Sequence, residues 1–269
     1  MKIKRALLIG INYENDPSIR LNGAINDATN MRNFLIQNQY FTANEITMMT
    51  DNSTGILYPT RANILNQFNV MLQLALSTNV NVDSVVLFVS YSGHATFIRD
   101  TNGDEEDGRD EMICPIDFRS AGCILDDVLK KIFINKLPKN TKLSVLMDAC
   151  NSGTLLDLKY NYLIDRTNTF KVYGDMFQTK AQVVLISGSR DDQLSVETVI
   201  GNITKLEQGV LTAAFISNYA VNISLYHLMT KIRNWVRNHK FTQIPQLSSG
   251  RLLNTRTTPN IYLEKNLII

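Results

Sequence analysis

Two apolar stretches, SVVLFVSYSGH at Ser84–His94 and LSVLMDAC at Leu143–Cys150, decide the fold of this chain. Each is a nearly continuous apolar run of strand length, which is typical of a central strand covered on both faces of a parallel sheet. One run ends at His94 and the other at Cys150. Ligands bind beyond the carboxyl ends of the strands in such sheets, so we expect the chemistry of this protein at these two residues.

Further strands and helices alternate around these two runs. Ile3–Gly10 is a third apolar run, and residues 23–38 place apolar side chains at helical spacing. The other expected strands are 45–49, 182–187 and an edge strand at 261–264, and the other expected helices are 60–76, 126–137, 209–218 and 222–239. We expect an irregular excursion with a hairpin at 95–124 and a mobile loop at 154–180. The alternating order predicts an α/β fold with a mostly parallel central sheet.

The composition favours a single domain spanning residues 1–269. The formal net charge is only +2, which gives no reason to expect nucleic acid or an anionic membrane as a partner. No apolar stretch approaches the roughly 18 residues of a membrane span, and the apolar run near the N-terminus is too short for a signal peptide. The cysteines Cys114, Cys123 and Cys150 form an odd set without metal-binding spacing. We therefore expect free thiols in a reducing compartment, with the cytoplasm as the default.

Cys150 and His94 form the candidate catalytic pair. A thiol is a useful nucleophile as its thiolate, and a neighbouring imidazole can take the thiol proton and later return it to a leaving amine. A cysteine and a histidine chosen blindly are more often a buried apolar residue and a hydrogen-bonded loop residue. The position of both at strand ends, with Gly and Ser close to each, favours the catalytic interpretation.

The residues around this pair resemble the motifs of metacaspases, within the caspase-like cysteine peptidases. Tyr91-Ser92-Gly93-His94 is similar to the family's histidine motif, and Asp148-Ala149-Cys150-Asn151-Ser152-Gly153 is similar to its cysteine motif. The separation of His94 and Cys150 also agrees with the roughly 50 residues expected for caspases. Further similar segments follow in the family's order at 6–13, 21–27, 187–193 and 243–247. The resemblance implies a caspase-like α/β/α sandwich and a bare catalytic core of the type I kind.

Three positions depart from the family pattern. Asn151 stands where the family has a His after its catalytic Cys, and Ala95 stands where it has a Gly after its catalytic His. The resemblance places the oxyanion hole at the backbone amides of Ala95 and Cys150, so a Cβ atom at residue 95 would disturb the hole if the backbone there had a positive φ. Ala24 replaces a further family Cys. These departures bear on the rate more than on the type of reaction.

The resemblance also places Asp27, Ser92 and Asp148 around the pocket for the substrate residue that precedes the cut bond. Two carboxylates in a partly closed pocket attract a cationic side chain and repel aspartate, which is the residue that caspases prefer. The implied substrates are therefore proteins or peptides with Arg or Lys before the cut. Two structural roles stay open for these acids: Asp27 as a first-turn carboxylate that favours the helix dipole, and Asp148 as a cap at a strand end.

Acidic residues after His94 suggest a cation site. The stretch 100–111 begins like an EF-hand loop, but Glu105 stands where that loop needs Gly, so a solvated acidic loop is the better interpretation. The resemblance implies instead a calcium site with dispersed ligands: Asp110, Asp126, Asp127 and Asp157. Hard oxygen ligands suit calcium, although adjacent aspartates at a helix start are also common caps. We expect calcium to activate the protein.

Together these features predict a calcium-activated, monomeric cysteine endopeptidase that cleaves after Arg or Lys through a thioester acyl-enzyme. The alternative is a catalytically weak or inactive caspase-like interaction or regulatory protein; it is less favoured because the dyad and the pocket acids are all present. A Rossmann-type nucleotide binder is set aside because Gly10-Ile11-Asn12-Tyr13 lacks the Gly-rich fingerprint. Self-cleavage is expected in the loop at 154–180, after one of its basic residues: Lys159, Arg166, Lys171 or Lys180.

Overall fold

The computed structural model describes most of the chain. The described residues are 2–81, 83–99, 109–149, 156–163, 169–172, 177–188, 197–199, 207–257 and 263. Cys150 lies outside them, as do residues 100–108 of the acidic stretch and the self-cleavage candidate Arg166. No described helix is both long and apolar enough to cross a membrane.

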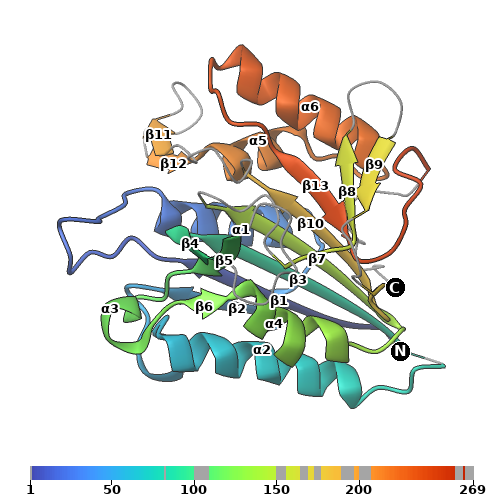
Figure 1. The fold of residues 1–269 in the computed structure, drawn as a ribbon, viewed down its shortest axis with the longest axis horizontal. Helices are drawn as coiled ribbons and strands as arrows, with labels where there is room; N and C mark the ends of the chain where they lie inside the picture. Colours follow the sequence, from blue (N-terminus) through green and yellow to red (C-terminus); the bar gives the residue numbers. More distant parts are fainter. Residues whose placement is uncertain are drawn as a thin grey trace.

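An eight-stranded sheet forms the centre of the molecule (Figure 1). Its strands, in spatial order, are β2 (Ile46–Thr50), β1 (Lys2–Gly10), β3 (Ser84–Ser92), β7 (Thr141–Asp148), β10 (Gln182–Ser187), β13 (Gln246–Ser249), β8 (Tyr160–Leu163) and β9 (Thr169–Val172). The first five strands are parallel to one another, and the pairs β10–β13, β13–β8 and β8–β9 are antiparallel. The predicted mostly parallel sheet is therefore present, with an antiparallel extension at one edge.

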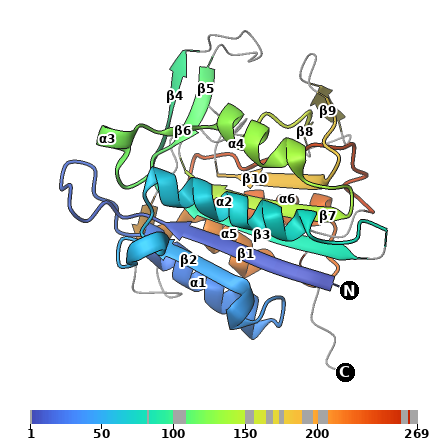
Figure 2. The same cartoon turned by 90° about the horizontal axis from the view of Figure 1, so that it is seen from below.

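Helices cover both faces of this sheet (Figure 1, Figure 2). One face carries α1 (Ala24–Gln37), α5 (Val210–Asn218) and α6 (Leu225–Asn238), and the other carries α2 (Arg61–Leu76) and α4 (Asp126–Ile132). The short helices are α3 (Phe118–Ala121) and the 3₁₀ turns η1 (Ala43–Glu45), η2 (Gly55–Leu57) and η3 (Ile134–Lys136). The side chain of Thr60 caps α2 by accepting a hydrogen bond from the amide of Asn63, and that of Ser224 caps α6 in the same way.

Successive side chains of the central strands point to alternate faces of the sheet, and this divides the core into two layers. In β1, Leu7 and Ile9 belong to the apolar cluster under α2 and α4, whereas Ala6 and Leu8 belong to the cluster under α1, α5 and α6. Successive side chains of a strand point to opposite faces, so a strand with apolar residues at every position has both faces buried. This is why the runs that decide the fold are continuously apolar.

Two smaller sheets flank the carboxyl ends of the parallel strands. The excursion after His94 forms a three-stranded antiparallel sheet of β4 (Ala95–Arg99), β5 (Arg109–Ile113) and β6 (Ile124–Leu125), which confirms the predicted hairpin. The other sheet pairs β11 (Glu197–Val199) with β12 (Glu207–Gly209), and β12 leads directly into α5.

Some predicted boundaries are wrong. Residues 154–180 were expected to form a loop, but they contain β8 and β9, which extend the edge of the central sheet. Each of these strands has four residues, too few to show a clear period, and their pairing depends on β13, which is remote in the sequence. The helix expected at 126–137 ends at Ile132 and is followed by η3. The edge strand expected at 261–264 lies, apart from Leu263, outside the described residues.

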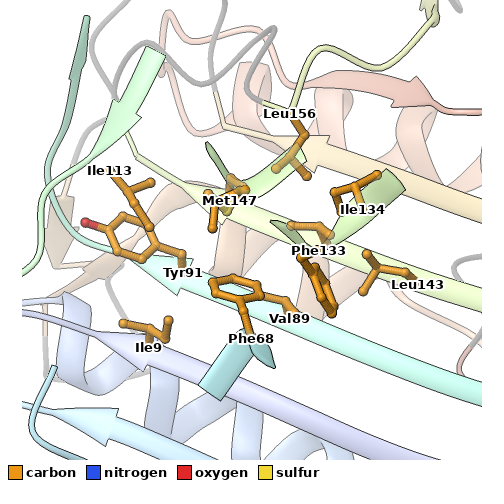
Figure 3. A pocket seen from close by; sticks show the side chains of 12 residues that line it. Ile9, Phe68, Val89, Tyr91, Ile113, Phe133, Ile134, Leu143, Met147 and Leu156 are labelled. Atoms are coloured by element: carbon orange, nitrogen blue, oxygen red, sulfur yellow. The ribbon is translucent and has the colours of Figure 1, made fainter. Parts of the chain in front are cut away.

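A small apolar cavity of about 20 Å³ lies between the sheet and helices α2 and α4 (Figure 3). Aliphatic and aromatic side chains line it, among them Val89, Phe133 and Leu156, and the lining includes neither His94 nor an acidic residue. A space of this size holds about one water molecule. It is a packing void in the core and is too small for a peptide.

Candidate active site

His94 lies at the carboxyl end of the parallel strands, two residues beyond the end of β3. The neighbouring strand β7 is paired with β3 in parallel as far as the pair Ser92 and Asp148. Ser92 lies two residues before His94, and Asp148 lies two residues before Cys150, the other predicted catalytic residue. Cys150 itself lies outside the described residues, so its role remains a prediction.

The ring of His94 is oriented by the loop that follows β1. Its Nε2 atom lies 2.6 Å from the carbonyl oxygen of Ile19. A carbonyl oxygen accepts hydrogen bonds and donates none, so Nε2 carries a hydrogen in this contact. In a neutral imidazole the other nitrogen, Nδ1, is then the atom that can accept a proton. The structure therefore leaves Nδ1 of His94 as the candidate base.

Two buried tyrosines hold the backbone of His94 in place. The amide of His94 donates to the hydroxyl of Tyr13 at 3.0 Å, and its carbonyl oxygen accepts from the hydroxyl of Tyr91 at 2.7 Å. The hydroxyl of Tyr13 donates in turn to the carbonyl oxygen of Cys114 at 2.6 Å, and the amide of Cys114 donates to the carbonyl oxygen of His94 at 3.0 Å. These bonds form a closed network around His94.

The local backbone makes this tyrosine network possible. A Cβ atom at residue 93 would lie 2.9 Å from the hydroxyl of Tyr91 and 3.2 Å from that of Tyr13, so Gly93 leaves room for both. Tyr13 has a φ of 54°, which is uncommon for an aromatic residue, and its ring lies 4.8 Å from that of His94. Burial raises the pKa of Tyr13 and of Tyr91 well above the ordinary value, so both hydroxyls stay protonated as donors.

Ala95 is the first residue of β4 and is buried. The described non-glycine residues with a positive φ do not include it. Its Cβ atom therefore causes no backbone strain, and the disturbance considered for a positive φ at this position does not arise. The amide of Ala95 remains a candidate for the oxyanion hole, and the amide of Cys150 lies outside the described residues.

Asp27, Ser92 and Asp148 come together at the carboxyl end of the parallel strands. The hydroxyl of Ser92 donates to Oδ2 of Asp27 at 2.6 Å. The amide of Gly209 donates to both oxygens of Asp27, at 2.9 and 3.0 Å, and the amide of Thr212 donates to Oδ2 of Asp148 at 2.7 Å. Both acids are buried, with exposed fractions of 2% and 6%. The predicted set is thus one cluster, although its carboxylates also anchor the start of α5.

Gly209 allows these two acids to approach the same point. A Cβ atom there would clash with the carboxylate of Asp148 and would lie 2.7 Å from Oδ2 of Asp27. The backbone of Gly209 has a φ of −69° and a ψ of 140°, values that any residue adopts. The requirement for glycine is therefore spatial: the residue at this position must leave room for two carboxylates.

A second cluster of carboxylates joins three separate segments. Glu111 of β5, Asp126 at the start of α4 and Asp157 each offer an oxygen that lies within 4.8 Å of the other two. All three residues are at most 5% exposed. The approach of Asp157 requires a left-handed turn, since Leu156 and Asp157 have φ values of 82° and 43°. Such conformations cost about 1–3 kcal/mol each and are often kept at functional sites.

The cluster fits a divalent cation. Oδ2 of Asp126 and Oδ1 of Asp157 are buried and have no hydrogen-bond partner among the groups that the structure describes. Nζ of Lys130 lies 3.2 Å from the other oxygen of Asp157. Burial, followed by the nearby charge of Asp157, raises the pKa of Asp126 to about 8. A bound cation would offset this repulsion, and a set of hard carboxylate oxygens suits calcium.

Asp110 and Asp127, the other two predicted ligands, are not members of this set of three. Asp110 precedes Glu111 on β5, so the two side chains point to opposite faces of that strand. Asp127 follows Asp126, and its amide donates to Oδ1 of Asp126 at 2.8 Å. Their roles as ligands stay predictions.

Sequence reasoning missed several residues of these sites. The positions of Tyr13 and Tyr91 within the quoted motifs could have drawn attention to their hydroxyls. Glu111 was considered only as the last position of an EF-hand-like stretch, and strand alternation would have separated it from Asp110. No local signal indicates Ile19 or Gly209, because both act through backbone atoms that only the folded chain brings to the site.

The comparison with protein families identifies the chain. The family model for the metacaspase, peptidase C14 domain matches residues 4–159, more than half of the sequence. The chain belongs to the metacaspase family. Metacaspases are cysteine peptidases, so the prediction that this chain belongs to a family of cysteine peptidases is confirmed.

Fungal metacaspases are similar to the chain over most of its length. Metacaspase-1A of Aspergillus niger is 36% identical over 93% of this chain and 71% of that protein. Metacaspase-1 of Ajellomyces capsulatus is 34% identical over 94% of this chain and 81% of that protein. Metacaspase-1A of Neurospora crassa is 33% identical over 92% of this chain, which spans 63% of the length of that relative.

A solved structure supports the fold. Protein GSU0716 from Geobacter sulfurreducens matches 98% of this chain and 99% of its own, with a TM-score of 0.64 and 22% identity. The predicted α/β/α sandwich with a mostly parallel central sheet is thus confirmed for this metacaspase.

Proposed function

We propose that the protein is a calcium-activated cysteine endopeptidase that cleaves peptide bonds after Arg or Lys. The observation that carries the proposal is the environment of His94. Its backbone is tied to two buried tyrosines and its Nε2 is bonded to Ile19, at the end of a strand whose parallel neighbour leads to Cys150. A histidine oriented in this way, beside the chain that carries a cysteine, supports a Cys-His dyad.

The geometry supports a sequence of proton transfers through one atom. Nδ1 of His94 takes the proton of the Cys150 thiol, and the thiolate attacks the substrate carbonyl carbon. The amides of Ala95 and Cys150 stabilise the resulting oxyanion. The imidazolium then protonates the leaving amine, which leaves a thioester. His94 finally takes a proton from the water that hydrolyses this thioester and returns it to the thiol.

The pocket acids support the preference for a basic side chain. Asp27 and Asp148 place two carboxylates beside Gly209, together with the hydroxyl of Ser92. A cation entering this cluster gains a charge-assisted interaction in a site with little water, whereas an anionic side chain is repelled. The extreme burial of both acids supports a pocket that binds the tip of a long side chain such as Arg or Lys.

The second cluster supports regulation by calcium. Glu111, Asp126 and Asp157 would hold the ion, and Asp110 and Asp127 remain proposed ligands. Bound calcium would supply positive charge that offsets the mutual repulsion of these carboxylates. The strand β5 that carries Glu111 ends beside Cys114, whose backbone is bonded to His94. The ordering of the cluster would therefore favour the competent arrangement of the histidine.

The direct test is a peptide-hydrolysis assay on the purified protein. Substrates that differ only in having Arg, Lys or Asp before the cut are compared with and without calcium, using magnesium as the control ion. We expect Arg and Lys substrates to be cut only with calcium, and Cys150→Ala to abolish turnover. Full activity of that variant contradicts the dyad, and binding of peptides without turnover by the unmodified protein favours the interaction-protein alternative.

Self-cleavage, a cytoplasmic location and a monomeric state belong to the same proposal. Lys180 is exposed and precedes β10, whereas Lys159 is only partly exposed beside β8. Of these two we expect Lys180 to be the preferred cut, because proteolysis requires access to the backbone. Peptide mapping after calcium treatment identifies the cut, and light scattering of the uncut Cys150→Ala variant measures the oligomeric state.

A further inference from the structure

The thiols of Cys114 and Cys123 face each other outside the proposed dyad. Their Sγ atoms are 3.4 Å apart. Cys114 follows β5 directly and Cys123 precedes β6 directly, and these two strands are paired in antiparallel register at Ile113 and Ile124. Continuing this register by one residue makes the two cysteines directly opposite.

Opposed positions of antiparallel strands suit a disulfide. Their Cα atoms are about 4.5–5.5 Å apart, which lies within the range of about 4.4–6.8 Å found for disulfides. Formation of the bond requires the sulfur atoms to move from 3.4 Å to about 2.05 Å, a shift that side-chain rotation can supply. The backbone of the paired strands β5 and β6 therefore does not have to move.

We propose that Cys114 and Cys123 form a reversible dithiol–disulfide site that a peroxide oxidises and that tightens the calcium cluster. In the first step the Cys123 thiol loses its proton and the thiolate attacks a peroxide oxygen: an S–O bond forms, the O–O bond breaks, and the leaving hydroxide takes up the thiol proton and departs as water. The thiol of Cys114 then transfers its proton to the leaving hydroxyl group as its sulfur attacks the sulfenic sulfur of Cys123: the S–S bond forms, the S–O bond breaks, and a second water leaves. Two thiols and one hydrogen peroxide thus give one disulfide and two waters.

The environments of the two thiols assign these roles. Cys123 is partly exposed and can meet a peroxide, whereas Cys114 is 3% exposed. Burial raises the pKa of the Cys114 thiol above the ordinary value, so it is the less reactive of the two toward solvent oxidants. Its contact with Cys123 makes it the resolving thiol for an oxidised neighbour.

The link to calcium follows from the spacing of residues, and it rests on the proposed calcium site. Glu111 lies three residues before Cys114, and Asp126 lies three residues after Cys123. A disulfide would therefore join the two segments that supply two of the three clustered carboxylates. Without a cation these carboxylates repel one another, and the cross-link would restrain their separation. The oxidised protein should bind calcium more tightly, and by linkage calcium should favour the disulfide.

The first experiment uses Cys150→Ala, which leaves these two residues as the only cysteines because the chain has three. After treatment with equimolar hydrogen peroxide, we expect the intact mass to fall by two hydrogen atoms and both thiols to be lost, with recovery in dithiothreitol. The matched variant carries Cys123→Ser in addition and should instead gain oxygen at Cys114 or stay unchanged. Addition of oxygen, or dimers linked between chains, in place of the internal disulfide overturns the site. Cys150→Ser serves as a second background if the first is poorly folded.

The second experiment titrates calcium into the reduced and oxidised forms by calorimetry. We expect the oxidised form to bind about fivefold more tightly, the low end of common couplings between sites. The variant with Cys123→Ser should bind alike before and after peroxide. Equal calcium affinities of the two forms would overturn the coupling between the disulfide and calcium binding. The mass measurement would still decide whether the disulfide forms. Absence of calcium binding in both forms contradicts the proposed calcium site, and the mass measurement still decides the disulfide.

Discussion

Replacing Tyr13 by Phe tests whether backbone support of His94 sets the reaction rate. The change removes the acceptor of the His94 amide, which is 3.0 Å from the hydroxyl, and a donor to the Cys114 carbonyl. A buried donor left without a partner costs about 1–3 kcal/mol. If that cost falls on the transition state, kcat/KM for an Arg peptide drops about 5- to 150-fold, since 1.36 kcal/mol corresponds to tenfold.

Tyr91→Phe is the matched control. It also deletes one buried hydroxyl, but the carbonyl oxygen of His94 keeps its bond from the amide of Cys114. The expected loss is that of one ordinary hydrogen bond, about 0.5–1.5 kcal/mol. Both variants are assayed with calcium and an Arg substrate, and their unfolding free energies are measured in denaturant. Equal turnover of the two variants, with Tyr13→Phe the less stable, would refute the positioning argument.

Three further predictions follow from the acidic sites and the buried tyrosines. Gly209→Ala should raise KM for Arg peptides at least tenfold, because the added Cβ atom displaces two carboxylates from the proposed pocket. Circular dichroism should show that the variant is still folded. An unchanged KM would contradict the proposed pocket. Lys130→Met should lower the unfolding free energy by about 1–3 kcal/mol without calcium, and by less with calcium, because the buried Asp157 loses its ion pair. Lys131→Met, at an exposed lysine, is the control. An equal loss of stability with and without calcium would contradict calcium binding at Asp157. The unfolding free energy should fall as the pH rises above about 10, the ordinary pKa of tyrosine, because the folded state keeps protons on Tyr13 and Tyr91 that the unfolded chain releases. Denaturant titrations should show a smaller pH-dependent fall in the unfolding free energy for Tyr13→Phe.

Strand ends were the part of the site that the sequence predicted best. Continuous apolar runs identified β3 and β7 because both faces of these strands are buried, and the last residues of the two strands, Ser92 and Asp148, are paired at the carboxyl end of the sheet. The resemblance also singled out Asp27 and Asp148, and the structure brings these two acids into one cluster beside Gly209. These features depend on patterns within one segment or on a matched motif.

Features that depend on pairing between remote segments escaped prediction. Which of Asp110 and Glu111 turns toward Asp126 is set by the register of β5 against β4 and β6, and neighbouring acids look alike in a sequence. The strands β8 and β9 were missed because four residues carry little periodicity and gain their stability from tertiary pairing. Likewise, the role of Ile19 comes from its carbonyl group, which every residue possesses.

The place of β13 in the sheet has a consequence for the order in which a newly made chain acquires its structure. β13 lies between β10 and β8, although it is the last of the three to leave the ribosome. While residues 246–249 are still in the exit tunnel, the five parallel strands can assemble, but the hairpin of β8 and β9 has no strand to join. Translation thus separates assembly of the parallel strands from completion of the sheet, and a ribosome-stalled chain ending before Gln246 should leave that hairpin open to limited digestion.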